Sequence, residues 1–218
     1  ILLQLQHFIN GDLRMRYMFF VIGIFILTLG IALTIKSNLG TSPFDALLVG
    51  LSRNVGLTVG SWEVILAIIM IICNAFVKME KPEILGLVTA IITGIGIDFW
   101  LFLLHYLDTP EFLISKLLYF SFGLILSGFG TSIYLQTNFA PIPVDHSTLI
   151  LKELIKSNIF IARTIIYVML LILAFIFNGP IGVGTVLTVC FGGMILNFFM
   201  PITEKILIIA LKLTEKVN

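Results

Sequence analysis

The sequence predicts an all-α membrane protein, with six transmembrane helices arranged as two inverted repeats of three helices each. The first observation is composition, because 59% of the 218 residues are hydrophobic and only 11% are charged. A soluble domain usually carries about 25% charged residues. The second is that the apolar residues lie in runs approaching the ~20 residues needed to cross a bilayer. The third is that the second half of the chain repeats the layout of the first.

The apolar runs predict the helix boundaries. Short broken or amphipathic segments follow the first and fourth helices. Residues 15–218 are expected to form one membrane domain, with repeats at about 17–107 and 117–200 and a cytoplasmic amphipathic tail at 203–218. Residues 1–14 show no clear period, and we expect them to be an extension or tag. The six helices are expected at about 17–35, 61–77, 84–104, 117–135, 159–177 and 181–200.

The placement of lysine and arginine predicts the orientation of the chain. With the N-terminus in the cytoplasm, only Lys36, Arg53 and Lys116 fall outside, which leaves ten of the thirteen basic residues inside. Cytoplasmic loops of membrane proteins carry such an excess. An even number of spans returns the chain to the same side, so both termini are expected in the cytoplasm.

The two halves match each other at a shift of about 100 residues. Three spans per half is an odd number, so the halves must enter the membrane from opposite sides, as in many secondary transporters. The broken segments at matching positions are then the expected binding region, because irregular backbone at that depth must be buried in protein or line a wet cavity. The matched pairs are Gly30 and Gly130, Asn38 and Asn138, Pro43 and Pro143, Asp45 and Asp145, and, at a shift of 99, Thr89 and Thr188, Gly94 and Gly193, Asp98 and Asn197, and Phe99 and Phe198.

The stretch from Leu29 to Asp45, LGIALTIKSNLGTSPFD, and the GLTVG that starts at Gly56 resemble the YczE/YyaS/YitT family of bacterial membrane proteins. The GVGT that starts at Gly182 is also similar to that family. The similarity covers nearly the whole chain after Met15, although the second half has Ala-Pro-Ile where the first has Gly-Thr-Ser. The resemblance implies a bacterial cytoplasmic-membrane protein, and it implies transport only weakly.

Asp98 is an acidic residue inside the third predicted span. Gly86, Ala90, Gly94 and Asp98 recur every four residues and therefore share one helix face. Small residues mark helix–helix contacts in membranes, so Asp98 is expected to face the bundle interior. An acid there is by default a functional candidate. The alternative, a wet carboxyl near the outer surface or one held neutral by hydrogen bonds, stays open. Its counterpart Asn197 is uncharged.

Asp45 and Asp145 each follow a proline at the start of a short segment. Ser42, Pro43 and Asp45 fit an N-cap, the first helical position and an acid in the first turn, so capping alone would explain Asp45. The equivalent cap position in the second half is Ile142, which cannot cap, yet Asp145 is present. That difference favours a shared role for the two acids, such as lining a polar cavity.

Other polar residues leave two interpretations open. Asn38 and Asn138 lie at the ends of their predicted spans. Their side chains would either bind polar groups of a substrate or only form hydrogen bonds with backbone groups. His146 would relay protons or be a plain interfacial histidine. Glu63 and Arg163 each begin a short span and are candidates for ion pairs with partners that the sequence does not identify.

Motifs of common enzymes are absent from the sequence. It contains no His-Glu-x-x-His, Gly-x-Ser-x-Gly, P-loop or Cys-x-x-Cys. A net charge of +1 without a basic patch gives no reason to expect nucleic-acid binding. We therefore expect no enzyme activity, no cofactor and no metal.

The predicted function is that of a small-solute secondary transporter or permease with its site between the repeats and with proton coupling through Asp98. Alternatives are a substrate-binding subunit of a multi-component importer, or a membrane accessory or scaffold protein. The expected partners are the lipid bilayer and an unknown small molecule, and a homo-oligomer or a partner membrane protein stays open. The candidate site residues are Asp98, Asp45, Asp145, Asn38, Asn138, Asn197, Pro43 and Pro143.

Overall fold

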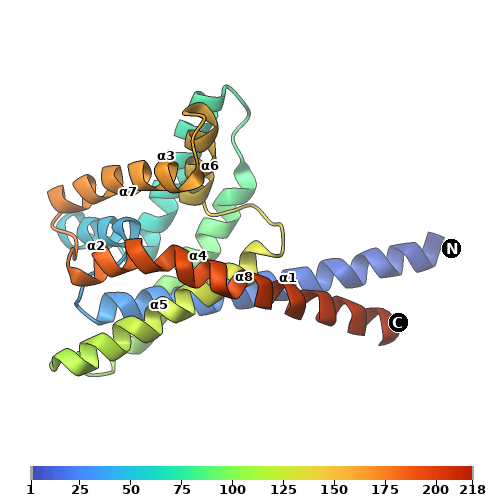
Figure 1. Cartoon of the computed structure of the whole chain (residues 1–218), viewed down its shortest axis with the longest axis horizontal. Coiled ribbons are helices and arrows are strands. Elements are labelled where there is room, and N and C mark those ends of the chain that lie inside the picture. Colours follow the sequence, from blue (N-terminus) through green and yellow to red (C-terminus); the bar gives the residue numbers. More distant parts are fainter. Residues whose placement is uncertain (1, 218) are drawn as a thin grey trace.

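The computed structural model of the chain describes residues 2–217, with side chains described for residues 13–158 and 161–211. This part of the chain is all-helical (Figure 1). Two short helices, the second and the sixth, interrupt the series of longer ones. The eight helices in the described part are α1 (Leu2–Lys36), α2 (Pro43–Val55), α3 (Val59–Lys78), α4 (Ile84–His105), α5 (Leu113–Leu135), α6 (Pro143–Leu154), α7 (Ile159–Ile176) and α8 (Val183–Val217).

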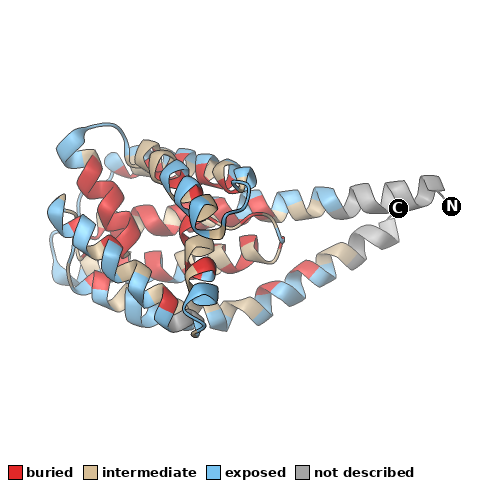
Figure 2. Ribbon diagram, turned by 90° about the horizontal axis from the view of Figure 1, so that it is seen from above, coloured by how far each residue is buried: buried red, intermediate tan, exposed pale blue. Residues whose placement is uncertain are grey.

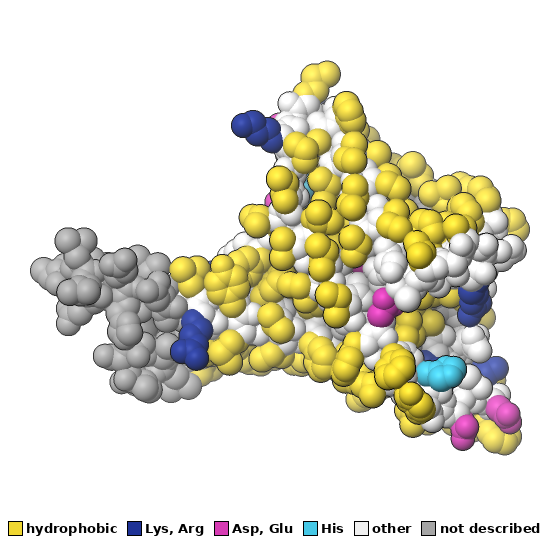
Figure 3. Space-filling view, turned by 180° about the vertical axis from the view of Figure 1, so that it is seen from behind, with side chains coloured by type: hydrophobic (Ala, Val, Ile, Leu, Met, Phe, Trp, Pro, Cys, Tyr) yellow, Lys and Arg dark blue, Asp and Glu magenta, His cyan; other side chains and the backbone are white. Residues whose placement is uncertain are grey.

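Five of these helices, α1, α3, α4, α5 and α8, are long and apolar enough to cross a membrane. Helix α7 is apolar but shorter, as expected for the short span of the second half. The outer surface is apolar too: Phe76, Phe112 and Phe175 are each more than three-quarters exposed. Figure 3 shows hydrophobic side chains over most of one face, with few charges among them. Exposing so much apolar surface to water would be energetically unfavourable. The protein is therefore an integral membrane protein.

Helices α2 and α6 are too short to span a bilayer. They have 13 and 12 residues, which at 1.5 Å per residue reach less than ~20 Å. Each begins at a proline, whose fixed φ and missing N–H suit the first helical position. The turn before each one contains an asparagine with left-handed backbone, Asn38 (φ 56°) and Asn138 (φ 57°). The broken segments predicted after the first and fourth spans are therefore present as turns followed by short helices.

Helices α1 and α5 pack closely along glycine faces. A Cβ atom added to Gly23 would lie 3.1 Å from the carbonyl oxygen of Gly130, and one added to Gly30 would lie 2.6 Å from that of Gly123. The contacts run in opposite order along the two helices, so α1 and α5 are antiparallel. The contacts are also reciprocal, because Gly123 and Gly130 are the repeat counterparts of Gly23 and Gly30. Small residues allow this backbone approach in membrane helices.

Several other helix contacts are reciprocal in the same sense, and the largest exception is the packing of α3 on α4. Helix α4 packs on α1 as α8 packs on α5, and α2 packs on α7 as α6 packs on α3. Helix α3 also packs extensively on α4, whereas the matching pair α7 and α8 shows no comparable packing in the described part of the chain. In Figure 1 the short helix α2 appears between α7 and α8.

Two helix ends differ from the prediction. Helix α1 begins at Leu2 instead of near residue 17, and Ile1 lies outside the described residues. The expected break after residue 200 is absent, because α8 continues through Pro201 to Val217. Thr203, just after this proline, donates hydrogen bonds to the carbonyl oxygens of Phe199 on its own helix and Ser132 on α5. Figure 2 shows buried residues inside the helix bundle, and on α8 they extend as far as Leu207.

Candidate functional site

The first turn of α2 carries a buried carboxylate. Asp45 is 8% exposed, and its Oδ2 atom accepts hydrogen bonds from the hydroxyls of Ser42 (2.6 Å) and Thr41 (3.4 Å). The Ser42 hydroxyl also accepts from the Asp45 backbone N–H, which confirms the predicted cap. Burial raises the pKa of the Asp45 carboxyl to about 6, and the two hydroxyl bonds oppose that rise.

The matching acid on α6 has different partners. Ile142 makes no side-chain cap, as predicted, and Asp145 instead faces α7 and α5. Its Oδ1 atom lies 3.3 Å from an Arg163 guanidinium nitrogen, and its Oδ2 atom accepts from the Tyr134 hydroxyl at 3.3 Å. The guanidinium carbon of Arg163 also lies 5.4 Å from the centre of the Tyr167 ring. Asp145 is therefore the ion-pair partner that the sequence could not assign to Arg163.

Glu63 is a third acid of this group and lies in the second turn of α3. It is 2% exposed, and its Oε1 atom has no hydrogen-bond partner among the described residues. Helix α3 packs against both α2 and α6, which carry Asp45 and Asp145. The acids on α2, α3 and α6 and one arginine on α7 thus form a polar cluster, which we call the acidic cluster; Asp45 and Glu63 are buried in it, and Asp145 and Arg163 are partly exposed. Buried charged groups in a membrane protein mark functional sites by default.

Asp98 lies elsewhere and contacts the start of α3. Its Oδ2 atom accepts from the Thr58 hydroxyl at 2.5 Å, and its Oδ1 atom accepts from the backbone N–H of Gly60 at 2.8 Å. The first N–H groups of a helix lack partners within the helix, and a carboxylate there is favoured by the helix dipole. Asp98 does face another helix, as its position beside Gly94 predicted, but its contacts are those of a cap supplied by α4.

Asp98→Ala is expected to destabilise the protein by roughly 1–2 kcal/mol, because it removes a charged acceptor from the N–H of Gly60 and from the Thr58 hydroxyl. The measurement is thermal unfolding of the purified protein in detergent. Asp108→Ala makes the same chemical change at an exposed loop position and should have little effect. Equal stability of the two variants would contradict a capping role for Asp98.

The remaining predicted residues divide into two groups. Pro43 and Pro143 are buried at the first position of the short helices and bring Asp45 and Asp145 toward the acidic cluster. Asn38 and Asn138 are exposed at helix-ending turns, where asparagine is favoured because it tolerates left-handed backbone. Asn197 is exposed on α8. The structure therefore does not bring the three asparagines into the cluster.

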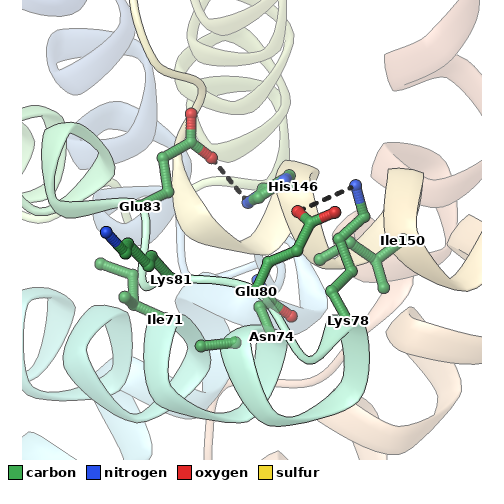
Figure 4. A pocket seen from close by; sticks show the side chains of 9 residues that line it. Ile71, Asn74, Lys78, Glu80, Lys81, Glu83, His146 and Ile150 are labelled. Atoms are coloured by element: carbon green, nitrogen blue, oxygen red, sulfur yellow. Dashed lines mark ion pairs between the residues drawn. The ribbon is translucent and has the colours of Figure 1, made fainter.

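A small pocket lies beside the acidic cluster, between the end of α3 and the start of α6. His146, the residue after Asp145, directs its Nδ1 atom at the Glu83 carboxylate 2.8 Å away (Figure 4). The amide oxygen of Asn74 accepts from the Ser147 hydroxyl, and its Nδ2 atom is buried without a partner among the described residues. The pocket is lined by Ile71, Asn74, Ala75, Lys78, Glu80, Lys81, Glu83, His146 and Ile150.

The chemistry available in the cluster is that of carboxylates, hydroxyls and one guanidinium. Within residues 13–158 and 161–211, no group of three histidine, cysteine or acidic side chains has the spacing of a metal site. Sequence reasoning did not anticipate Tyr134, Tyr167 or Thr41. The signal available for Glu63 and Arg163 was their charge near the start of a span, with a shift of 100 residues between them.

Comparison with known proteins finds a matching family model and several relatives. Residues 14–201 match the model of DUF6198, described as a family of unknown function. The chain is 60% identical to the uncharacterized protein YyaS of Bacillus subtilis (strain 168), over 88% of this chain and 95% of the relative. It is 32% identical to the uncharacterized membrane protein YczE of the same strain, over 90% of each chain. It is 24% identical to an uncharacterized protein of Haemophilus influenzae, over 83% of this chain and 81% of the relative. No solved structure matches.

Proposed function

The chain belongs to the DUF6198 family, whose function is unknown, and from that premise we propose that it is a small-solute secondary transporter or permease of a bacterial cytoplasmic membrane. The predicted resemblance to YczE and YyaS is confirmed by the identities of 32% and 60%. Relatives from Bacillus and Haemophilus support a bacterial setting. The start of α1 and the end of α8 point to the same side (Figure 1), which supports our proposal that both termini are cytoplasmic.

An inverted-repeat architecture is the first part of the proposal. Gly23 approaches Gly130 while its counterpart Gly123 approaches Gly30, so the same surface is used twice in opposite directions. Such reciprocal contacts are what a two-fold axis generates. Antiparallel packing of matching helices supports an axis in the membrane plane. Transporters with this symmetry bind their substrates near the bilayer midplane, where discontinuous helices from the two repeats meet.

The observation that carries the proposal is that two proline-initiated short helices, α2 and α6, both pack against α3 and α7. Asp45 and Asp145 lie in the equivalent first turns of these helices, α3 carries Glu63, and α7 carries Arg163. A protein needs no such arrangement merely to be stable in lipid, since buried charges in a membrane are costly. Their concentration at the junction of broken helices supports a pathway for a polar solute.

The balance of charges in the cluster favours a solute that carries a positive group. Asp45, Glu63 and Asp145 supply three carboxyl groups, whereas Arg163 supplies one guanidinium and is already paired. An ammonium group would satisfy carboxylate oxygens that the protein leaves without a cation. The Tyr134 hydroxyl and the Tyr167 ring border the same region and offer a further hydrogen bond and a cation–π surface.

Uptake into liposomes tests the proposal. The purified protein in proteoliposomes should accumulate or exchange at least one radiolabelled amine, amino acid or organic cation from a panel, whereas empty liposomes should not. Asp145→Asn should reduce that flux at least ten-fold, because it removes a carboxylate from the cluster. Asp108→Asn, the same change at an exposed position, should leave the flux intact. Absence of flux for the whole panel would contradict the proposal.

A further inference from the structure

We propose that Glu63 is the proton-binding residue of this protein, holding a proton while the site is closed and releasing it when the site opens. The inference rests on the proposed transport function and adds the coupling ion to it. Its basis is that Glu63 is buried and that one of its carboxylate oxygens lacks a hydrogen-bond partner among the described residues. In addition, Glu63 and Asp45 occupy the positions at which the second half has an ion pair.

The repeat symmetry shows what is missing beside Glu63. Arg163 is the counterpart of Glu63 and Asp145 is the counterpart of Asp45, each at a shift of 100 residues. In the second half these positions form the Arg163–Asp145 ion pair at 3.3 Å. In the first half the same positions hold two acids, Glu63 and Asp45. A single proton between two neighbouring carboxyl groups removes the repulsion that two negative charges would create there. The proton thus takes the place of the arginine.

Every other charged group around Glu63 already has a partner. Helix α3 packs on α2, α4 and α6. Helices α5 and α7 reach the cluster through Tyr134 and Arg163, which contact Asp145 on α6. Asp45 accepts from Ser42, Asp98 accepts from the start of α3, and Arg163 pairs with Asp145. His146 pairs with Glu83. The charged or titratable groups that belong to the cluster or border it are Asp45 on α2, Tyr134 on α5, Asp145 and His146 on α6, and Arg163 and Tyr167 on α7. Asp98 on α4 contacts the start of α3, outside the cluster.

Burial makes the neutral acid the favoured form. A carboxylate with 2% exposure cannot be solvated by water, and Glu63 Oε1 receives no hydrogen bond from the described residues. An ionised carboxyl in such a place is costly unless a cation neutralises it. The proton adds to a carboxylate oxygen of Glu63 to give the neutral acid. It leaves as a hydrated proton when water or a positively charged solute reaches the cluster.

Labelling with a hydrophobic carbodiimide tests this inference without knowledge of the transported solute. Dicyclohexylcarbodiimide reacts with protonated carboxyl groups in apolar surroundings: the acid proton moves to a reagent nitrogen and the carboxylate oxygen adds to the central carbon. The product rearranges to a stable N-acylurea that retains all atoms of the reagent. Mass spectrometry of the labelled, detergent-purified full chain should find the adduct on Glu63 at about pH 7, with less adduct as the pH rises.

Four variants make the labelling result specific. Glu63→Gln should abolish the adduct and Glu63→Asp should retain it. Asp45→Asn should shift the loss of labelling to lower pH by about one unit or more, because the neighbouring negative charge is gone. Asp98→Asn, which alters an acid outside the cluster, should leave the labelling of Glu63 unchanged.

Several outcomes would overturn the inference. These are absence of label on Glu63 at every pH, labelling of Asp98 instead, and protection by sodium or potassium ions, which would make Glu63 a metal-cation site. The result is also separable from the proposed function. Flux in liposomes without labelling of Glu63 would reject only the proton site. Labelling without flux of any solute in the panel would leave a proton-binding membrane protein that is not a transporter of those solutes.

Discussion

Alanine in place of Gly94 should destabilise the protein by roughly 1–3 kcal/mol, the usual cost of forcing extra atoms into a packed interface. A Cβ atom at this position would lie 2.5 Å from the carbonyl oxygen of Gly60, where α4 crosses the first turn of α3. The contacting atom belongs to the backbone, so no rotamer change can relieve the overlap. For a chain of this size each kcal/mol corresponds to about 2–4 °C in melting temperature, which thermal unfolding in detergent can resolve.

Gly193→Ala is the matched control for this prediction. Gly193 is the repeat counterpart of Gly94, and a Cβ atom there would meet nothing within 4 Å among the described residues. Alanine also favours a helix over glycine by up to about 1 kcal/mol, so this variant should be neutral or slightly more stable. Comparable destabilisation by the two substitutions would mean that α3 and α4 do not cross at Gly60 and Gly94.

Arg163→Gln should abolish most of the transport activity, with at least a ten-fold loss of flux in proteoliposomes, and should destabilise the protein by about 2 kcal/mol. The substitution leaves Asp145 with the Tyr134 hydroxyl as a partner but without a cation. Removing one partner of a fully buried pair costs about 3–5 kcal/mol and an exposed pair contributes about 0–1 kcal/mol. The Arg163 and Asp145 side chains are 34% and 28% exposed, so we place this pair between those limits.

Two further variants separate the loss of the ion pair from a general loss of charge. Arg53→Gln makes the same change at an exposed position of α2 and should retain both stability and flux. The double variant Arg163→Gln with Asp145→Asn should recover part of the lost stability, because no unpaired charge remains, but it should not recover flux. Full flux in Arg163→Gln would exclude the ion pair from the solute pathway.

Sequence reasoning reached the broken segments because their signals are local. Proline at the first helical position, serine before it and an acid in the first turn describe the start of α2 without any knowledge of the fold. The counterpart Ile142 makes no side-chain cap, as predicted, and the shared role inferred from it for Asp45 and Asp145 stays a prediction. The ion pair of Asp145 with Arg163 depends on how α6 and α7 pack, which local patterns do not specify.

The roles of Asn38, Asn138, Asp98 and Glu63 were harder to predict from the sequence. Asn38 and Asn138 recur at the same place in both halves, which suggested binding, but a repeat also duplicates its turns, and their left-handed backbone accounts for the asparagine. Asp98 was correctly expected to face another helix, yet a helical-face argument cannot show that the neighbouring element is the unsatisfied start of α3. Glu63 gave only the signal of a charge near a span end, because its isolation is a property of the packed structure.

The unequal packing of the third and fourth helices in each half has a mechanical consequence for transport. Asp98 and the Gly60–Gly94 crossing fasten the helix that bears Glu63 to α4, whereas the helix that bears Arg163 lacks an equivalent attachment to α8 in the described part of the chain. The two halves are therefore braced differently, because α3 packs on α4 as well as on the short helices, whereas α7 packs chiefly on α2 and α6. Under the proposed function, we expect α7, which bears Arg163, to be displaced more than α3, which bears Glu63, when the site opens. The two repeats would then move unequally although their folds match.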